Sequence, residues 1–596
     1  MDLKPLEKKQ VVQYVNFLCN FLNVDNKVRT LLLLIGERVV FLWTKSGVKF
    51  TIQYLAEVMR LLLCFLSEEE IIEDKVKVKR YKNGLPKLLG ERGAMIIAQL
   101  RNSQDWKSIR SASYLVKVLL SIISMFRAMS PEHVIKFDSV VKPFDGQYQT
   151  VGKDDLRVAL GKLGIQKLEL KSPKFLWSNK AGVNANRAWV SYSLDLIAMI
   201  ESPLIWTNYI KYCWKLSYYS WMLRFIVISL LHIPFVIFRR VELSTYVFIL
   251  ISFWVFLIGN VVDLANLEDS ILIFGGYIIF KKYFIFVLGN YSMFYEHGHV
   301  HDDGYVILNL GRLSIKKEMR GKARVVGITD NWTQCLFKPL HDTIYSFLSN
   351  NVAEDGTMDQ LKPINEALYD RDSESFVSVD LSAATDRLPL AIQIDILNIL
   401  GIPGTEWGQI LKRPYDYRNS PKVYAVGQPM GAYSSFAMLA LTNHVIMMLA
   451  LVRSGVNQVP NQYAILGDDV AIKDQRLADS YIKIMRDLGV EINPIKGFRG
   501  RILEFAKRLF YIPNGNIPKG AVDLSPLGAK AALRASRDPI FLTTLIVDYF
   551  NKGFNILLRM ELSVLSKILS STFNKEGLTL NTFLFAILGP QSGLWS

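Results

Sequence analysis

Two short apolar runs that meet aspartates constrain what this chain can fold into. The first, Phe376–Asp380, ends on an acid, and the second, Tyr463–Ile472, is interrupted by the tripeptide Gly467–Asp469. Short apolar runs bounded by turn residues are typical of buried strands, and a glycine permits a tight turn that displays two acids at a hairpin tip. Adjacent carboxylates repel one another, so a hard, oxygen-liganded cation such as Mg2+ is expected beside them.

On its own the tripeptide fits an ordinary turn, because glycine and aspartate are favoured turn residues. The acid that ends the upstream run is well placed to meet the hairpin tip. Two-metal phosphoryl transfer needs carboxylates that converge on two ions about 3.5–4 Å apart, one activating the attacking hydroxyl and one stabilising the pyrophosphate. We therefore predict that Asp380 and Asp468 bridge two Mg2+ ions, with Mn2+ as the alternative metal, and that Asp469 is an auxiliary ligand. All three are predicted to be catalytic.

Residues 427–444 combine a loop of small residues with a long apolar helix. Small residues let a backbone approach a nucleic-acid strand. Ser435, Thr442 and Asn443 carry neutral hydrogen-bonding groups suited to sugar hydroxyls, and the 2′-hydroxyl separates ribonucleotides from deoxyribonucleotides. We predict that Asn443 makes that contact together with Asp386. Taken singly, such residues are more often helix caps or packing groups.

Basic residues stand on both sides of the acids. Lys322 and Arg324 alternate along a β-type run within the stretch 314–327 and so share one face, which suits a triphosphate. A solvated basic strand is the alternative. Downstream, Lys496 is predicted to donate a proton to the leaving pyrophosphate, although a surface lysine fits its context equally well.

Composition bounds the class of protein. The chain of 596 residues is 50% hydrophobic and 21% charged, which fits a folded protein with several subdomains. Its net charge of +16 favours a polyanionic partner, either nucleic acid or an anionic membrane. The four cysteines form no CxxC pair, so neither a disulfide framework nor a zinc site is indicated.

An apolar block at 221–289 leaves two interpretations open. Within it, Leu243–Val262 runs twenty residues without a charge, long enough to cross a bilayer core of about 30 Å. The two flanks of the block have to share one compartment if they belong to one folded protein, so a membrane segment there has to return as a hairpin. Buried or interfacial helices are the other interpretation.

The order of these motifs matches right-hand polymerases of RNA viruses, and the chain resembles the mitovirus replicases. The matching motifs lie between about residues 170 and 525. They are 175–182 (FLWSNKAG), 321–330 (GKARVVGITD), 332–334 (WTQ), 338–342 (KPLHD), 355–360 (DGTMDQ), 380–389 (DLSAATDRLP), 427–444, 467–469 (GDD) and 505–508 (FAKR). The apolar block at 221–289 is outside the matching pattern.

The β-type runs and helices after residue 308 predict an α+β fold, and the resemblance implies a right hand of fingers, palm and thumb with an antiparallel palm sheet. The expected division is 1–170, a largely helical N-terminal region; 171–375, fingers, with the apolar block and the basic motif; 376–389, palm, with the first acids; 390–425, a fingers insertion; 426–522, the rest of the palm; and 523–596, a helical thumb.

The resemblance also implies a function. It implies Mg2+-dependent RNA synthesis from nucleoside triphosphates, an RNA template and a product duplex as partners, and replication inside host mitochondria. The resemblance also implies roles for single residues. Asp380 and Asp468 match the metal-binding acids of the family, and Asp386 and Asn443 match its ribose-sensing pair. Lys322 and Arg324 match the fingers residues near the incoming triphosphate.

Two other classes of protein compete with this interpretation. A reverse transcriptase or intron maturase shares the palm, but such enzymes usually place an aromatic steric gate where this chain has Asp386, and an aromatic residue where Leu466 precedes the Gly-Asp-Asp turn. A noncatalytic membrane scaffold would fit the apolar block and the basic balance. The complete set of acids argues against the scaffold.

Overall fold

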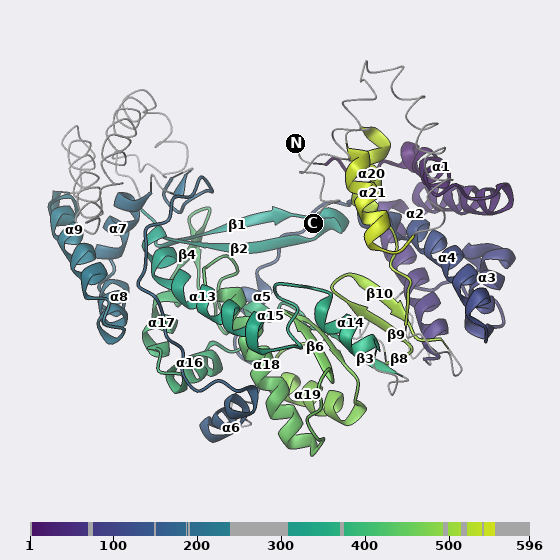
Figure 1. Ribbon diagram of the computed structural model, residues 1–596. Coiled ribbons are helices and arrows are strands. Elements are labelled where there is room, and N and C mark those ends of the chain that lie inside the picture. The colour runs from purple at the N-terminus through teal and green to yellow at the C-terminus, as the bar shows by residue number, and fades with distance from the viewer. Residues whose placement is uncertain are drawn as a thin grey trace, which may run out of the picture.

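The computed structural model describes residues 3–69, 76–147, 151–185, 187–188, 191–238, 308–369, 375–492, 499–513, 521–538 and 541–554 (Figure 1). Lys496 and the charge-free run Leu243–Val262 lie outside these residues. The described chain combines many helices with three small sheets, of strand order β2-β1-β4-β5, β11-β10-β9 and β6-β7-β3-β8. The predicted α+β class is confirmed.

The sheet β6-β7-β3-β8 contains both apolar runs that the sequence singled out. Its strands are β3 (Phe376–Asp380), β6 (Tyr463–Leu466), β7 (Asp469–Ile472) and β8 (Arg499–Gly500), and all neighbouring pairs are antiparallel. Helices α18 (Ser435–Ser454) and α19 (Gln475–Asp487) pack against it. The Asp474 carboxylate caps α19 by accepting from the Leu477 amide at 3.0 Å, so both ends of β7 are fixed locally.

A group of helices shares one hydrophobic core with this sheet. These helices are α6 (Lys153–Leu163), α7 (Tyr192–Ile200), α8 (Pro203–Lys215), α9 (Tyr219–Phe238), α13 (Asn331–Asn351), α15 (Ala384–Arg387), α16 (Leu390–Ile399), α17 (Gly404–Leu411), α18 and α19. Trp221 and Phe225, at the start of the apolar block, are buried in this core. The first turns of α9 are therefore a packed part of the protein, while residues 239–307 lie outside the described chain.

A long hairpin spans the molecule. It is made of β1 (Gly311–Lys317) and β2 (Ala323–Thr329), and β4 (Tyr415–Tyr417) and β5 (Ser420–Lys422) complete its sheet (Figure 1). At its tip the Arg320 amide donates to the Met129 carbonyl at 2.8 Å, and His133 Nε2 donates to the Glu318 carbonyl at 2.8 Å. The hairpin therefore bridges the helices that carry the sheet and the N-terminal helices.

The N-terminal and C-terminal helices share a second core. It joins α1 (Val11–Phe21), α2 (Asn26–Ser67), α3 (Gly90–Asn102) and α4 (Trp106–Ile123) to β9 (Ile502–Phe505), β10 (Arg508–Tyr511), β11 (Val522–Asp523), α20 (Ala529–Arg537) and α21 (Leu542–Asn551). Arg537 donates to the Lys4 and Pro5 carbonyls at 2.6 and 2.8 Å. Segments that the sequence analysis described as separate regions thus pack as one unit. The short helices α5 (Asp138–Val141) and α14 (Lys362–Tyr369) complete the described α-helices.

Three described helices are long and apolar enough to cross a membrane by length and composition alone. They are Asn26–Ser67, Trp106–Ala128 and Ser435–Ser454, and 67%, 78% and 89% of their apolar windows are buried inside the protein. Their apolar faces are therefore largely accounted for by the two cores.

The shared second core predicts that a cavity made in α4 is felt in α20. Leu120→Ala removes a fully buried side chain and is expected to cost about 2–5 kcal/mol of unfolding free energy. Hydrogen exchange measured by mass spectrometry should rise in α4 and in α20 together. Leu449→Ala in α18 belongs to the other core and is the control, with its effect confined to α18 and its neighbours. Unchanged protection of α20 in Leu120→Ala would contradict a shared core.

Candidate active site

The backbone register brings the three predicted catalytic acids together. Asp380 at the end of β3 lies directly opposite Asp469 at the start of β7, and the Leu381 amide donates to the Asp468 carbonyl at 3.3 Å. Directly opposed residues of antiparallel strands have Cβ atoms about 4.5–5.5 Å apart. Gly467 between the strands has φ +60°, and a Cβ there would stand 2.6 Å from the Phe436 ring, so only glycine fits this turn.

Three acids at one end of a sheet offer hard oxygen atoms of the kind that Mg2+ prefers. Among the described residues, no group of three or more His, Cys, Asp or Glu side chains is gathered closely enough to hold a metal ion by itself. Magnesium does not need one, because it usually takes one or two protein carboxylates and completes its octahedron with waters and substrate phosphates. The arrangement therefore suits an ion that is completed by a nucleotide.

Asn443 is hydrogen-bonded to the Gly467–Asp469 turn. Its Nδ2 donates to the Gly467 carbonyl at 2.8 Å, and its Oδ1 accepts from the Tyr481 hydroxyl at 2.6 Å. Asn443 and Tyr481 are both fully buried. Burial, with a further contribution from Asp468, raises the pKa of Tyr481, so its hydroxyl remains a donor. The sequence predicted a ribose contact for Asn443. In the structure its amide lies between Tyr481 of α19 and the Gly467–Asp469 turn.

Asp386 lies in a tight enclosure formed by distant segments. Ser139 Oγ donates to Asp386 Oδ2 at 2.7 Å, and the Gly427 amide donates to the Asp386 carbonyl at 2.9 Å. A Cβ on Gly427 would come within 2.3 Å of the Thr385 carbonyl, so glycine permits this approach. Burial raises the pKa of Asp386 to about 6. Its Oδ1 is buried and has no hydrogen-bond partner within the described residues.

The loop that leads into α18 is fixed from both sides by Gln334 of α13. Gln334 Nε2 donates to the Gly431 carbonyl at 3.1 Å, and its Oε1 accepts from the Tyr433 amide at 2.7 Å. Ser435 begins α18 and Thr442 lies within it, both buried, with hydroxyls that lack a partner among the described residues. Gln334 belongs to the matching motif 332–334, and its spacing gave no indication of this role.

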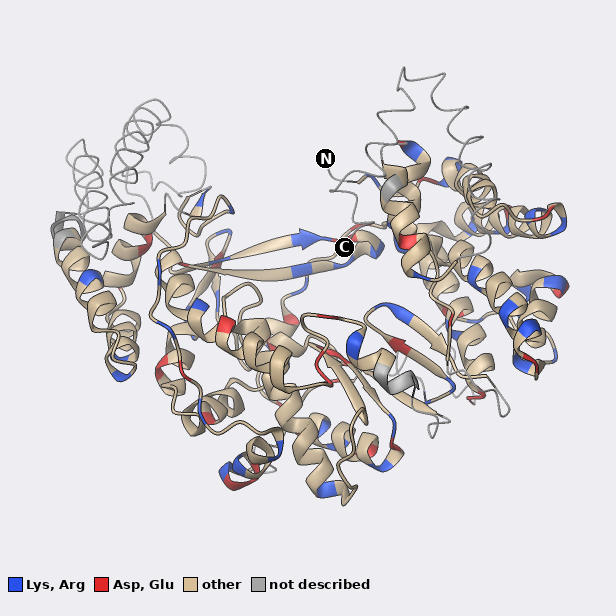
Figure 2. Cartoon of the chain, viewed as in Figure 1, with Lys and Arg blue, Asp and Glu red and all other residues tan. Residues whose placement is uncertain are grey.

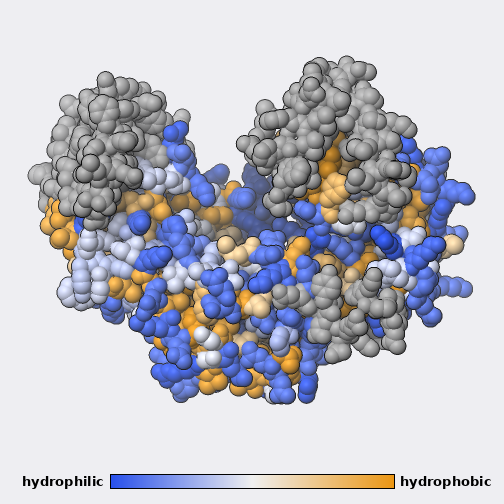
Figure 3. Space-filling model, viewed as in Figure 1, coloured by the Kyte–Doolittle hydropathy of each residue, from blue (hydrophilic) through white to orange (hydrophobic). Residues whose placement is uncertain are grey.

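The two predicted phosphate-binding residues lie on the long hairpin. Lys322 is exposed just before β2, and Arg324 pairs with Glu318 at 3.0 Å. Arg324 also stands directly opposite Lys316 of β1, so positive charge gathers on this part of the hairpin (Figure 2). Figure 3 shows hydrophilic residues, with some hydrophobic ones among them, at the floor of the central hollow. Lys496 lies outside the described residues.

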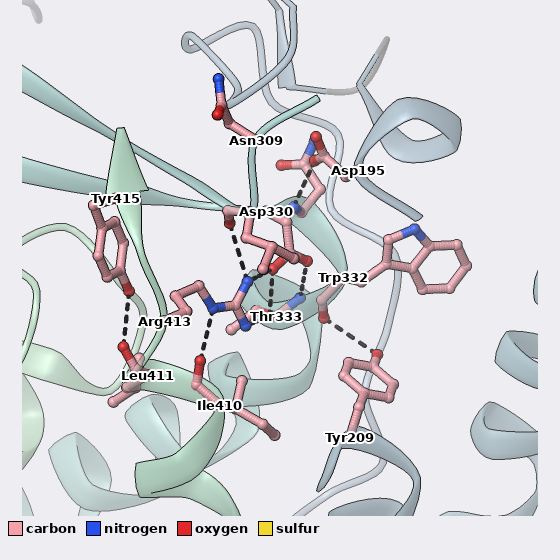
Figure 4. Close-up of polar contacts among 12 residues, drawn as sticks. Asp195, Tyr209, Asn309, Asp330, Trp332, Thr333, Ile410, Leu411, Arg413 and Tyr415 are labelled. Atoms are coloured by element: carbon pink, nitrogen blue, oxygen red, sulfur yellow. Dashed lines mark hydrogen bonds and ion pairs between the residues drawn. The ribbon is translucent and has the colours of Figure 1, made fainter. Parts of the chain in front are cut away.

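A buried charged cluster anchors the base of the hairpin (Figure 4). Asp330 follows β2 and caps α13 by accepting from the Thr333 amide at 2.7 Å, and Arg413 pairs with Asp330 and donates to Thr333 Oγ1 at 2.8 Å. Asp195 of α7 accepts from the Asn331 amide at 2.9 Å. Burial and the neighbouring Asp330 raise the pKa of Asp195 to about 7. Arg413 and Asp195 could not be singled out from the sequence, because their partners Asp330 and Asn331 lie far away along the chain.

The antiparallel sheet with three acids at one end, the supporting helices and the bridging basic hairpin form the arrangement expected of a right-hand polymerase fold. The model of the family described as mitovirus RNA-dependent RNA polymerase matches residues 168–585, and the chain belongs to this family. The predicted resemblance is thereby confirmed.

Three relatives illustrate the likeness. The chain is 31% identical over 480 residues to the RNA-directed RNA polymerase of Cryphonectria parasitica mitovirus 1, covering 78% of this chain and 51% of that protein. It is 32% identical over 203 residues to an uncharacterized mitochondrial protein of Arabidopsis thaliana, covering 31% of this chain and 76% of that one. A crystal structure of the RNA-dependent RNA polymerase of a human picobirnavirus aligns with TM-score 0.37 and 16% identity over 48% of this chain and 60% of that chain. The chain thus spans about half the length of its viral relative.

Tyr481→Phe tests the support beneath the turn. The change leaves Asn443 Oδ1 without its donor in a buried position, which costs about 1–3 kcal/mol, and it loosens the hold on Gly467. RNA synthesis should slow and require more Mg2+ for half-maximal rate, while RNA binding stays unchanged. The measurement is a Mg2+ titration of nucleotide incorporation.

The matched control for Tyr481→Phe is Tyr511→Phe. Tyr511 is also buried, and its hydroxyl has no hydrogen-bond partner among the described residues. An equal effect of both changes on the Mg2+ dependence would show that the bond to Asn443 has no particular role.

Proposed function

We propose that this protein is an RNA-directed RNA polymerase that copies an RNA template from nucleoside triphosphates and releases pyrophosphate. The observation that carries the proposal is the register of β3 against β7, which sets Asp380 opposite Asp469 with Asp468 in the adjoining turn. Membership of the mitovirus polymerase family supports the same activity.

In this proposal Asp380 and Asp468 hold two Mg2+ ions, with Mn2+ as a substitute, and Asp469 is an auxiliary ligand. When bound, the ions lower the pKa of the attacking hydroxyl and neutralise charge on the leaving group. The chain's own contribution is to hold three carboxylates at one sheet end. Asn443 and Tyr481 contribute by fixing the turn that carries two of those carboxylates.

Ribose selection is assigned chiefly to Asp386. Its Oδ2 is held by Ser139, while its Oδ1 has no described partner and can accept a hydrogen bond from a ribose hydroxyl. Ser435 and Thr442 keep their predicted role as neutral groups around the sugar. Asn443, predicted as the second ribose contact, acts in this proposal through the turn.

The positive hairpin supplies the triphosphate contacts. Lys322 is exposed and Arg324 is partly exposed, and arginine can grip phosphate oxygens in a bidentate manner. The pair that Arg324 makes with Glu318 is partly exposed, so exchanging the carboxylate for a phosphate costs little. Proton donation by Lys496 completes the proposed set.

A mitochondrial location is proposed on the family resemblance. Its further support is the likeness to proteins of Arabidopsis thaliana that are described as mitochondrial. Association with a membrane through 221–289 is kept as a proposal about a segment that lies mostly outside the described residues.

Neutralising the acids should abolish synthesis without unfolding the sheet. Asp380→Asn and Asp468→Asn keep side-chain shape but remove the charge that holds a divalent ion. Incorporation of labelled nucleotides on an RNA template should fall to background, while RNA binding persists. Asp154→Asn on exposed α6 is the control and should keep full activity. Turnover retained by either variant would refute the metal assignment.

Ribonucleotide selection should depend on pH through Asp386. The carboxyl, with its pKa raised to about 6, is ionised at pH 7.5 and largely neutral at pH 5.5, where it accepts hydrogen bonds less strongly. The preference for ribonucleotides over deoxyribonucleotides should therefore decline several-fold over this range. Taking a ratio of the two rates cancels pH effects that they share.

The control for this pH dependence is Asp386→Asn, which cannot titrate. Its selection ratio should be weaker and flat with pH. A wild-type ratio that does not change between pH 7.5 and 5.5 would remove Asp386 from the ribose contact. A wild-type preference for deoxyribonucleotides would instead favour the reverse-transcriptase reading.

A further inference from the structure

One side of α13 presents a partly exposed stripe toward the loop that precedes α18. Gln334, Lys338, His341 and Tyr345 stand three or four residues apart and so line one side of the helix. The residues between them include the buried set Cys335, Leu336, Phe337, Leu340 and Ile344, which joins the core. The stripe is therefore the half-buried side of α13, and within it Tyr345 also packs against the edge of that core.

Contacts between aromatic rings connect this stripe to the Gly467–Asp469 turn. The His341 ring lies 4.2 Å from Tyr345 and 5.3 Å from Tyr433, and Tyr345 meets Phe436 edge-on at 6.5 Å. Phe436 is 39% exposed, and its ring closely approaches Gly467. We call these four residues, His341, Tyr345, Tyr433 and Phe436, the aromatic row.

The charges beside the row are compatible with a polyanion. Lys338 Nζ lies 5.8 Å from the Tyr433 ring centroid and pairs with Asp342 one turn further along. That pair is partly exposed and so contributes little stability, which leaves Lys338 able to exchange Asp342 for a phosphate. Burial lowers the pKa of His341, so near neutral pH its ring is uncharged and acts as an aromatic surface.

We propose that the aromatic row is a stacking site for unpaired bases of the RNA template beside the catalytic turn. The inference rests on the proposed polymerase function and extends it to residues with no assigned role. Aromatic side chains next to a cation bind single strands because every base offers a π-face, whatever its identity. Bases inside a duplex already stack on their neighbours, so the row suits the template before it is paired.

The row takes its geometry from the same loop that shapes the site. The Gln334 side chain bonds the Gly431 carbonyl and the Tyr433 amide, on either side of Ala432. These bonds fix the backbone at Tyr433, and Phe436 follows three residues later. A base stacked there lies next to Gly467 and hence close to the acids. The row therefore places the next template base within reach of the incoming nucleotide, without reading its sequence.

Substitutions that separate aromaticity from packing test the proposal. Tyr345→Leu combined with Tyr433→Leu keeps apolar volume but removes the π-faces, and the matched variant is Tyr345→Phe combined with Tyr433→Phe. Binding of fluorescently labelled single-stranded RNA is measured by anisotropy in EDTA, so that no synthesis occurs. The Leu pair should bind about 5- to 100-fold more weakly than wild type, and the Phe pair within about two-fold.

Two controls complete the experiment. Phe41→Leu removes an exposed ring that also has a lysine over it, Lys45 at 6.0 Å, but that lies on α2, and it should leave RNA binding unchanged. A blunt duplex RNA should bind the Leu pair and the Phe pair alike. Thermal melting of all variants establishes that they are folded.

The outcomes separate this proposal from the proposed function. Equal binding of single-stranded RNA by the Leu and Phe pairs would reduce the row to packing, and so would a wild type that does not bind single-stranded RNA. Synthesis by the wild type is assayed separately with Mg2+ and nucleoside triphosphates. Failure of that assay would overturn the polymerase function, while the binding comparison would still decide the row.

Discussion

The antiparallel pairing of β3 with β7 is the constraint on which the rest of the structure depends. It sets Asp380 opposite Asp469, and like charges directly opposite one another destabilise a sheet. The surrounding structure offsets this repulsion by fixing the Gly467–Asp469 turn and β6 with several hydrogen bonds. Asn443 bonds the Gly467 carbonyl, and residues 354–356 extend the sheet by bonding both backbone groups of Ile465, at 3.0 and 2.8 Å. His444 Nε2, 3.1 Å from Asp355, ties that extension to α18. The repulsion is thus concentrated where a cation can relieve it.

The hairpin has a comparable anchor at its base. Arg413 and Asp330 are fully buried, so each is costly to bury alone and the two stabilise one another only in one geometry. That geometry links the end of β2 to the first turn of α13. The opposite end of the hairpin contacts residues 129–133, so a strand pair that carries the predicted triphosphate ligands is fixed at both ends. Fixing both ends of the hairpin limits the positions that Lys322 and Arg324 can take.

Local patterns predicted the features that are local. The two apolar runs and the glycine turn follow from strand period and turn chemistry, and the alternation of Lys322 and Arg324 follows from a strand. Asn443 was harder, because a polar residue in an apolar helix can be a ligand group but is more often a packing group. Its partner Gly467 is 24 residues away, so no local pattern predicts the hydrogen bond between them. Ser139 lies 247 residues from Asp386 and gave no signal at all.

The position of Ser139 also bears on what the catalytic unit is. The family match begins at residue 168, yet the segment before it reaches the proposed ribose site. Arg387, next to Asp386, donates to the Lys142 carbonyl at 2.6 Å and pairs with Asp145, and the Gln147 amide donates to the Asp487 carbonyl at 2.5 Å at the end of α19. Residues 138–147 therefore contact both α15, which carries Asp386, and the end of α19. Because the N-terminal helices share a core with the C-terminal ones, this segment connects that core to the site, and the matched region alone lacks contacts that hold Asp386 in place.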